Sequence, residues 1–286
     1  MKGESYFRKI LVPVDGSHPC LHAEELAAVI AKNFESKVTV IHVVSHELMQ
    51  ATRKLDYQIP SPVLAEITNW FSQAGRKILW EAETLFKEEG VEVDARLVEY
   101  GNPAETILRV AKDEKYDLIA IGNRGETEAE VFSLGSVAEK VSRHAEGPVL
   151  IVKQKTKLSK ILVAIDGSES AEKALEYAVQ LAKKHKAKLT LVNVQESKIF
   201  GLKPEIAREI GERVLSGATA KVEGVEFNTQ LEFGNLAETI IEVAEKENYD
   251  LTVVGSRGLS SVKRFFLGSV SDDVSHHAKC SVLIVR

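Results

Sequence analysis

The segment Ile10-Leu-Val-Pro-Val-Asp-Gly-Ser17 recurs as Ile161-Leu-Val-Ala-Ile-Asp-Gly-Ser168, with six of eight residues identical. A second segment, Gly101-Asn-Pro-Ala-Glu-Thr-Ile107, returns as Gly234-Asn-Leu-Ala-Glu-Thr-Ile240. The period is that of a whole domain, whereas a solenoid repeat returns every few tens of residues. The sequence therefore predicts two tandem copies of one domain.

The polar segment 153–160 separates the two copies and is suited to a linker. We predict an N-terminal domain at 1–156 and a C-terminal domain at 157–286. The spacing of the repeat falls from 151 to 133 residues between His42 and Gly101, so the first half carries 18 extra residues. We place them around 45–65 and interpret them as a surface loop, with a lid over the first crevice as the alternative.

The composition bounds the class of protein. With 286 residues, 44% hydrophobic and 28% charged, the chain fits two globular domains of ordinary size. The net charge of −5 gives no basic field, so nucleic acid is not an expected partner. The sequence shows neither an apolar run of about 20 residues nor a secretory signal, and we expect a cytoplasmic protein without a membrane partner. Cys20 and Cys280 occupy unequal repeat positions and are predicted to be free structural thiols, with no metal site.

Alternating strands and helices indicate an α/β fold. In the first half, apolar and β-branched runs at 9–14, 37–44, 91–99, 117–122 and 148–152 read as five strands, separated by four stretches of helical period. Strands joined through helices pair in parallel, and their apolar character fits a sheet covered on both faces. We predict two tandem doubly wound domains, each a five-stranded parallel sheet with helices on both faces.

A glycine segment follows the fourth predicted strand of each half. Gly122-Asn-Arg-Gly125, nine residues and Gly135-Ser136 return as Gly255-Ser-Arg-Gly258, nine residues and Gly268-Ser269. Glycines leave backbone N–H groups uncovered, and a helix start carries unpaired N–H groups and about half a positive charge, which favours phosphate. The two serines can cap their helices or donate to a phosphate oxygen. The dinucleotide and P-loop fingerprints do not match this pattern.

This glycine pattern, with an Asp at the end of the first strand, resembles that of the universal stress protein family over nearly the whole chain. The resemblance implies strand order 3-2-1-4-5, pairing through the last strand, and a regulatory role under stress that involves an unidentified protein partner. It also implies a site for an adenine nucleotide, ATP or AMP, with magnesium as an option beside ATP. In the family the Asp holds adenine, a Val after the second strand offers a backbone contact, and the glycines surround ribose and phosphates. Carried onto this sequence, the predicted nucleotide-binding residues are Pro13, Val14, Asp15, Val43, Gly122, Arg124, Gly125, Gly135, Ser136, Val137, Ala164, Ile165, Asp166, Val194, Gly255, Arg257, Gly258, Gly268, Ser269 and Val270.

Several alternatives stay open at this point. Asp15 and Asp166 are also typical turn residues in Asp-Gly-Ser, irrespective of any ligand. We recognise no nucleophile with an orienting base, so no catalytic residue is predicted and a nucleotide-driven binding switch is favoured. A slow magnesium-dependent ATP hydrolase and a structural dimerisation module with vestigial pockets are the other two interpretations.

The two glycine segments differ in charge. Residues 124–134 sum to −2 and residues 257–267 to +3, and Asp272 and Asp273 in the next helical turn reduce the second sum to +1. The remaining difference of three charges predicts that the C-terminal crevice is the better triphosphate site and that the N-terminal one binds weakly or prefers AMP, unless these side chains face solvent. His42 corresponds to Asn193, so the two crevices cannot share a proton-transfer group. Trp70 and Trp80 lie in a stretch of helical period and are predicted to pack rather than to bind a base.

The last strands of the two halves are equally apolar. Val149-Leu-Ile-Val152 and Val282-Leu-Ile-Val285 would be adhesive edges if they were exposed. We predict that they meet within one chain as a pseudo-dimer, and a homodimer of whole chains remains open.

Overall fold

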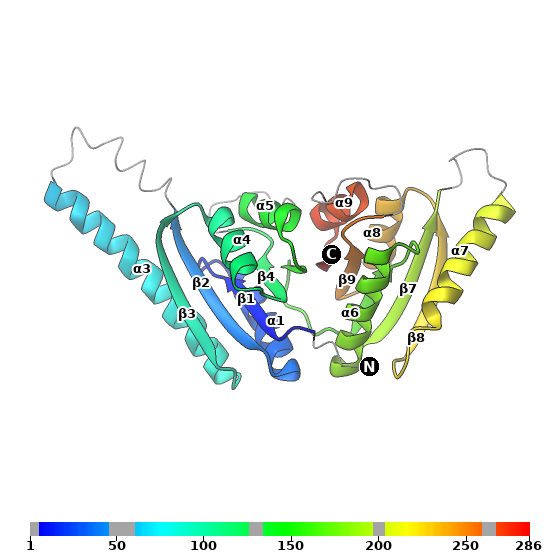
Figure 1. Cartoon of the computed structure of the whole chain (residues 1–286), viewed down its shortest axis with the longest axis horizontal. Coiled ribbons are helices and arrows are strands. Elements are labelled where there is room, and N and C mark those ends of the chain that lie inside the picture. Colours follow the sequence, from blue (N-terminus) through cyan, green and yellow to red (C-terminus); the bar gives the residue numbers. More distant parts are fainter. Residues whose placement is uncertain (1–5, 46–60, 126–133, 197–203, 259–266) are drawn as a thin grey trace.

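The computed structural model describes residues 6–45, 61–125, 134–196, 204–258 and 267–286 (Figure 1). Strands and helices alternate through both halves, as predicted. The first half comprises β1 Lys9–Pro13, α1 His18–Phe34, β2 Lys37–Ser45, α3 Ser61–Glu88, β3 Val93–Gly101, α4 Pro103–Asp113, β4 Leu118–Gly122, α5 Ser136–His144 and β5 Val149–Val152. The second half comprises β6 Lys160–Ala164, α6 Glu169–His185, β7 Lys188–Gln195, α7 Pro204–Thr219, β8 Phe227–Phe233, α8 Leu236–Lys246, β9 Leu251–Gly255, α9 Ser269–His277 and β10 Ser281–Val285.

All ten of these strands form one sheet. Its order is β3-β2-β1-β4-β5-β10-β9-β6-β7-β8, so each half has the order 3-2-1-4-5 when counted from its outer edge. Neighbours within a half are parallel, whereas β5 and β10 are antiparallel, with Leu150 opposite Leu283. The predicted fold, strand order and pairing of the last strands are therefore confirmed.

Successive residues of the inner strands enter different cores. In β1, Ile10 and Val12 pack on the side of α1 and α3, and Leu11 packs on the side of α4 and α5. This alternation follows from the pleat of a strand, and both cores continue through the second half. Helices therefore cover both faces of the sheet, while α3 and α7 lie at its two outer ends (Figure 1).

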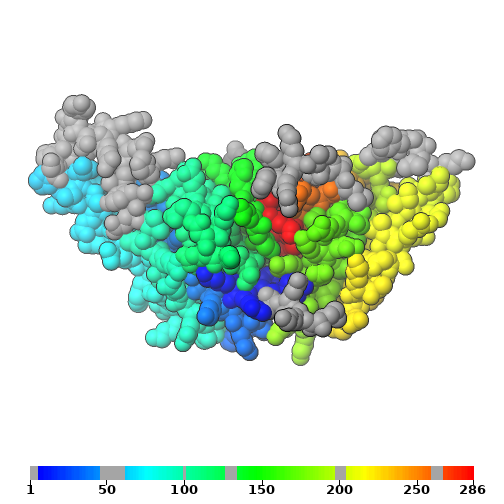
Figure 2. Space-filling view, in the orientation of Figure 1, coloured from blue at the N-terminus to red at the C-terminus, as the bar shows by residue number. Residues whose placement is uncertain are grey.

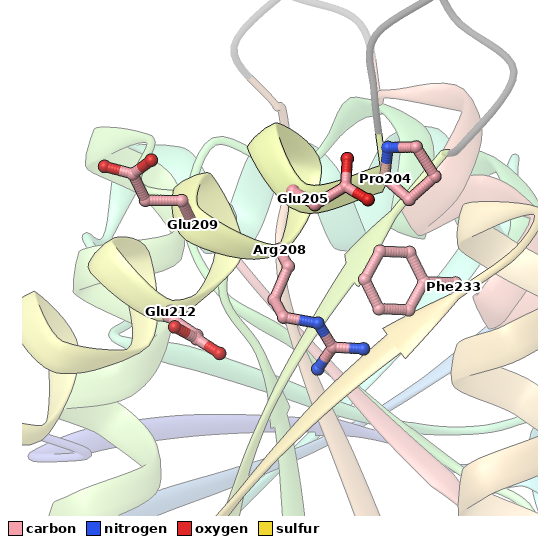
Figure 3. A pocket seen from close by; sticks show the side chains of 6 residues that line it. All are labelled: Pro204, Glu205, Arg208, Glu209, Glu212 and Phe233. Carbon is pink, nitrogen blue, oxygen red and sulfur yellow. The ribbon is translucent and has the colours of Figure 1, made fainter.

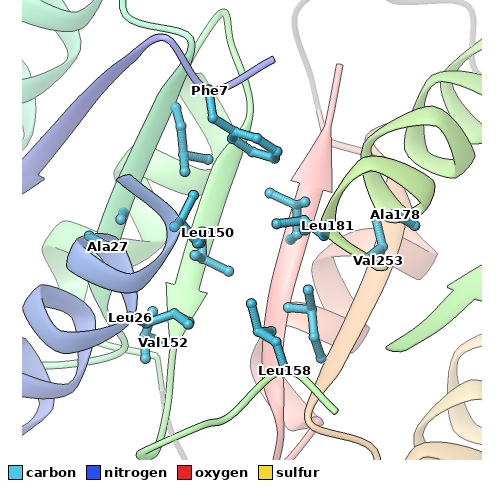
Figure 4. Close-up of a cluster of buried hydrophobic side chains, with 14 of the residues drawn as sticks. Phe7, Leu26, Ala27, Leu150, Val152, Leu158, Ala178, Leu181 and Val253 are labelled. Carbon is cyan, nitrogen blue, oxygen red and sulfur yellow. The ribbon is translucent and has the colours of Figure 1, made fainter. Parts of the chain in front are cut away.

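The central seam is closed by apolar side chains from both halves (Figure 4). Phe7 and Leu158 are fully buried and adopt the same left-handed φ, 58° and 51°. They occupy equivalent repeat positions just before β1 and β6. Leu158 lies in the segment predicted as a polar linker, and its burial anchors that segment in the core. Figure 2 shows the two halves in contact in the middle of this face.

Local signals set the helix starts at matching positions of the two halves. The Ser17 hydroxyl accepts from the Cys20 amide (3.3 Å), and the Ser168 hydroxyl accepts from the Ala171 amide (3.2 Å). Asn102 and Asn235 cap α4 and α8 through their side-chain oxygens. Each such cap contributes about 1 kcal/mol. The caps at the starts of α1 and α6 fix the loop between the Asp-Gly-Ser segment and the helix.

Part of the extra length of the first half lies in a helix rather than in a loop. Residues 61–65 belong to α3, which has 28 residues, whereas α7 has 16. Proline is tolerated in the first turn of a helix, so Pro62 does not prevent the helix from starting at Ser61. The rest of the predicted loop, and the possible lid, lie outside the described residues. Across the described ranges, no helix combines the length and apolar character needed to cross a membrane.

Candidate functional site

The predicted residues of the first half surround one cavity. Its volume is about 550 Å³, within the usual range for a small-molecule site. The lining comes from the ends of β1, β2 and β4, from the start of α5, and from α3 and α4. All ten residues predicted for the first half are among those that line it: Pro13, Val14, Asp15, Val43, Gly122, Arg124, Gly125, Gly135, Ser136 and Val137. The cavity lies beyond the carboxyl ends of β1 and β4, where the winding of the sheet reverses.

Asp15 is held by its own turn and faces the glycine segment. Its Oδ1 accepts from the Ser17 amide at 3.0 Å, while Gly16 adopts φ +80°. A Cβ placed on Gly125 would lie 2.7 Å from Asp15 Oδ2. Only glycine at position 125 leaves room for Oδ2. Asp15 therefore stabilises its own turn through Oδ1 and directs Oδ2 at the glycine segment.

The second half repeats this geometry. Asp166 Oδ1 accepts from the Ser168 amide at 2.9 Å, and a Cβ on Gly258 would lie 2.9 Å from Asp166 Oδ2. The predicted residues of this half occupy the matching ends of β6, β7 and β9 and the start of α9: Ala164, Ile165, Asp166, Val194, Gly255, Arg257, Gly258, Gly268, Ser269 and Val270.

Gly122 and Gly255 allow the sheet to approach the starts of α1 and α6. A Cβ on Gly122 would lie 2.8 Å from the carbonyl of Pro19, and one on Gly255 would lie 2.7 Å from the amide nitrogen of Ala171. These obstacles are backbone atoms that cannot move aside. The two motif glycines thus bring strand ends and helix starts together at each crevice.

α5 and α9 both begin with a glycine as N-cap. Gly135 and Gly268 have extended backbone and make no side-chain capping bond, and the serines that follow are the first helical residues. The alternative in which Ser136 and Ser269 cap their helices is therefore wrong. With glycine as N-cap, the first-turn amides lack a side-chain acceptor at the cap and point beyond the helix, which favours an anion there.

In the second half, hydroxyl groups tie the glycine segment to the start of α6. Ser168 Oγ donates to the Arg257 carbonyl at 3.2 Å, and Ser170 Oγ also donates to that carbonyl. Proline occupies position 19, which corresponds to Ser170 in the repeat. The first half therefore cannot make the second of these two bonds.

His42 and Asn193 perform the same structural task with different side chains. The His42 Nδ1–H donates to the Val14 carbonyl at 2.8 Å, and Asn193 Nδ2 donates to the Ile165 carbonyl at 2.6 Å. Each bond fixes the backbone just before the motif Asp. The sequence comparison placed these residues in register, but the motif gave them no role. Their matching positions in the repeat were the only sign in the sequence that they share a structural role.

The expectation that Trp70 and Trp80 are packed is wrong. Their exposed fractions are 64% and 63%. Trp70 lines the first cavity together with Phe71, and the two rings meet edge to face with centroids 5.1 Å apart. Helical period identified α3 but did not show that its N-terminal part extends beyond the strand ends, where it has less sheet to cover.

The predicted charge difference between the crevices depends mainly on residues 126–133 and 259–266, which lie outside the described residues. One acid from that comparison is engaged elsewhere. Asp272 accepts from Arg143 Nε and Nη2 at 3.0 and 2.9 Å, across the central seam. Its charge is therefore partly neutralised within the protein.

A separate groove of about 470 Å³ lies between α7 and the end of β8 (Figure 3). Arg208 lies over the ring of Phe233, 5.3 Å from its centroid. Glu205, Glu209 and Glu212 complete its charged lining along one side of α7. Its lining contains none of the predicted nucleotide-binding residues.

The fold and the site geometry together define a class: tandem doubly wound α/β domains with a glycine segment at each reversal of winding, which in the first domain lines a cavity. The chain belongs to the universal stress protein family, because the family model matches residues 6–153 and again residues 157–286. The resemblance inferred from the glycine pattern is thereby confirmed.

Individual relatives agree with this assignment. A protein of Staphylococcus aureus strain USA300 that carries the family name is 40% identical over a match of 139 residues, which covers 44% of this chain and 82% of that protein. The crystal structure of a universal stress protein from Archaeoglobus fulgidus matches 99% of both chains with a TM-score of 0.72 and 26% identity. A Pseudomonas aeruginosa protein of unknown function matches 98% of this chain and 92% of its own, with a TM-score of 0.70. At 19% identity, this last likeness concerns the fold alone.

Proposed function

We propose that this protein is a regulator that binds an adenine nucleotide, ATP or AMP, in its crevices and offers a protein partner a surface that depends on occupancy. The observation that carries the proposal is the first cavity. Ten residues, chosen from separate segments by their motif positions, line it together. Membership of the universal stress protein family, in which the glycine pattern accompanies nucleotide binding, supports the same ligand class.

The chemistry of the lining suits such a ligand. The Asp15 carboxylate accepts from the exocyclic amino group of adenine, and the backbone at Val43 supplies a further contact. Amides of the glycine segment and of the first turn of α5 receive the phosphates. With ATP, a magnesium ion would accompany the phosphates and reduce their charge. In the second half Asp166, Val194 and the start of α9 take the same roles.

A path for signalling follows from the placement of α5 and α9. Each begins at a crevice and reaches the central seam, where Arg143 of α5 bridges to Asp272 of α9. A phosphate at the start of either helix would bias its position relative to the other half. Occupancy is thereby linked to the surface around the seam, which we propose as the region a partner reads.

The test uses the full chain with Ser136→Glu and Ser269→Glu, separately and together. A glutamate in the first turn is compatible with the helix dipole but repels a phosphate, and a like charge at about 4 Å is worth on the order of 1–4 kcal/mol. We expect each change to weaken ATP binding at its own crevice about tenfold or more, with adenosine much less affected. Equilibrium dialysis at low and moderate salt measures both ligands, and thermal unfolding serves as the folding control.

The outcomes separate the candidate functions. Wild-type protein that binds neither ATP nor AMP at millimolar concentration would leave the structural dimerisation module as the better explanation. Time-dependent formation of ADP, lost in the double variant, would favour the slow hydrolase. Mass spectrometry of a denatured extract identifies which adenine nucleotide the protein carries after purification.

A further inference from the structure

An exposed aromatic wall flanks the first crevice. Trp70 and Phe71, on α3, both line the cavity, although neither belongs to the glycine motif. Tryptophan is a large amphipathic side chain that usually covers apolar surface, yet Trp70 is 64% exposed. Its partner ring, Phe71, is half-buried and holds it edge to face.

Contacts lower on α3 fix the position of this wall. A Cβ on Gly75 would lie 2.7 Å from His42 Cδ2, so the helix rests directly on the strand residue that orients Val14. Ile78 packs against Gly16: a Cβ added to Gly16 would lie 3.1 Å from Ile78 Cγ1. Trp70 lies five residues before Gly75, about 7.5 Å farther along the helix axis. It therefore lies beyond these contacts toward the helix N-terminus, and it lines the cavity together with Asp15.

The second half has the same scaffold with an aliphatic wall. Gly211 of α7 packs against Asn193, as Gly75 of α3 packs against His42. Val214 packs against Gly167, as Ile78 packs against Gly16. Counting back five residues from Gly211 gives Ile206, which is 43% exposed, and the position matching Phe71 is Ala207. The aromatic pair is thus a feature of the first crevice and not of the repeat.

We propose that Trp70 is a ligand-contacting residue that stacks on the base bound in the first crevice, and so makes this crevice selective for ligands with an aromatic base. The inference rests on the proposed nucleotide binding and adds a residue that the glycine motif does not supply. Stacking requires a flat, exposed ring at a cavity, and Trp70 provides one that lines this cavity together with Phe71 and Val14. Base–aromatic stacking typically changes affinity by roughly tenfold.

Trp70 also supplies its own reporter, because the chain contains two tryptophans. Trp80 is similarly exposed, at 63%, and is not among the residues lining the cavity. In Trp80→Phe protein the remaining emission comes from Trp70, and we expect saturable quenching by ATP at the concentration at which dialysis shows the first site filling. The matched Trp70→Phe protein, with Trp80 alone, is expected to show no saturable change.

Affinity measurements complete the test. We expect Trp70→Ile, which copies the wall of the second crevice, to weaken ATP binding at the first site roughly tenfold while binding of tripolyphosphate is unchanged. The reverse change, Ile206→Trp, is expected to strengthen ATP binding at the second site. Tripolyphosphate carries the charge without the base, so it reports structural damage to the phosphate site.

The results distinguish two failures. If wild-type protein binds neither ATP nor AMP in dialysis, the proposed function fails and the stacking role falls with it. If wild-type protein binds ATP but Trp70→Ile binds it equally well and Trp70 emission does not respond, the stacking role alone is overturned. Equal losses for ATP and tripolyphosphate would also overturn it, because they would indicate a structural effect.

Discussion

Glu24 places a carboxyl group inside the core, under the first crevice. Its side chain is 6% exposed on α1, and the equivalent residue of α6 is Leu175, exposed 2%. Cys20 Sγ donates to Glu24 Oε1 at 3.4 Å, and Cys20 itself lines the cavity. Burial, with a smaller contribution from nearby acids including Asp15, raises the pKa of Glu24 from its ordinary 4.5 to about 7. A group that the second half replaces by leucine therefore titrates near neutrality.

The stability of the protein should depend on pH through this group. Between pH 4.5 and 7 the folded chain binds more protons at Glu24 than the unfolded chain, so the free energy of unfolding falls as pH rises. A pKa difference of this size corresponds to about 3 kcal/mol. We expect Glu24→Leu to raise the free energy of unfolding by up to about 3 kcal/mol at pH 8 and by much less at pH 5. Urea unfolding at both pH values measures this, with Glu24→Gln as the size-matched control. Equal gains at both pH values would contradict the assignment.

At the level of single residues, the sequence predicted those that obey a repeated pattern and missed those that do not. Asp15 and Gly125 could be paired in advance because both halves keep each of them within the same motif, and the structure places Gly125 directly beside the Asp15 carboxylate. His42 and Asn193 were aligned but differ chemically, so their common bond to the preceding turn could not be deduced. Trp70 was misjudged because helical period reports which face a side chain occupies, and not whether another element covers it.

At the level of elements, apolar runs were sufficient to locate the strands, whereas their order in the sheet was implied by the family resemblance. The inner strands β1, β4, β5, β6, β9 and β10 are buried on both faces, so their ends are marked by the polar and glycine residues that follow. The start of α3 was missed because residues 61–65 were placed in the surface loop, whereas a proline in the first turn, here Pro62, is compatible with a helix. The close contacts of α3 and α7 with the sheet could not be predicted either. Gly75 and Gly211 lie inside helices, and nothing in the neighbouring sequence shows that a strand side chain packs against them.

The helix glycines of α7 give a paired test of this packing. A Cβ on Gly211 would lie 2.8 Å from Asn193 Oδ1 and closer still to Leu231, whereas one on Gly217 would meet nothing within 4 Å. We expect Gly211→Ala to destabilise the protein by about 1–3 kcal/mol through overpacking against β7 and β8. Gly217→Ala should instead stabilise it by about 0.5–1 kcal/mol, because alanine is the better helix former. Denaturant unfolding compares the two variants, and a loss of stability in both would contradict the role given to Gly211.

At the level of the whole molecule, the seam joins the halves through matching cations as well as through β5 and β10. Lys153, just after β5, donates from Nζ to the carbonyls of His276 and Ala278 at the end of α9. Arg286, just after β10, donates from Nη2 to the Ser142 carbonyl near the end of α5. Carbonyls at helix C-termini lack intrahelical donors and carry negative potential. Each half therefore supplies a cation that stabilises the C-terminal end of a helix in the other half.

This arrangement predicts that the two halves unfold as one unit. Unfolding of the second half alone would expose β5, whose four residues are at most 2% exposed, together with Phe7. Burial of about 25 cal/mol per Å² makes such exposure cost several kcal/mol, so the first half should lose its stability as well. We expect Leu191→Ala, a buried change in β7 at the far side of the second half, to lower global stability by about 2–5 kcal/mol.

Hydrogen–deuterium exchange with mass spectrometry reads the consequence separately in each half. In the Leu191→Ala protein, amides of β1 and β4 should exchange faster than in wild type. The acceleration should equal that of amides in β6 and β9, because both halves lose the same free energy of unfolding. The outer helix α3 serves as an internal reference, because exchange at its N-terminal end is expected to be fast in both proteins. Faster exchange confined to the second half would mean that β5 is stable without β10, and that the continuous sheet joins two independent folding units.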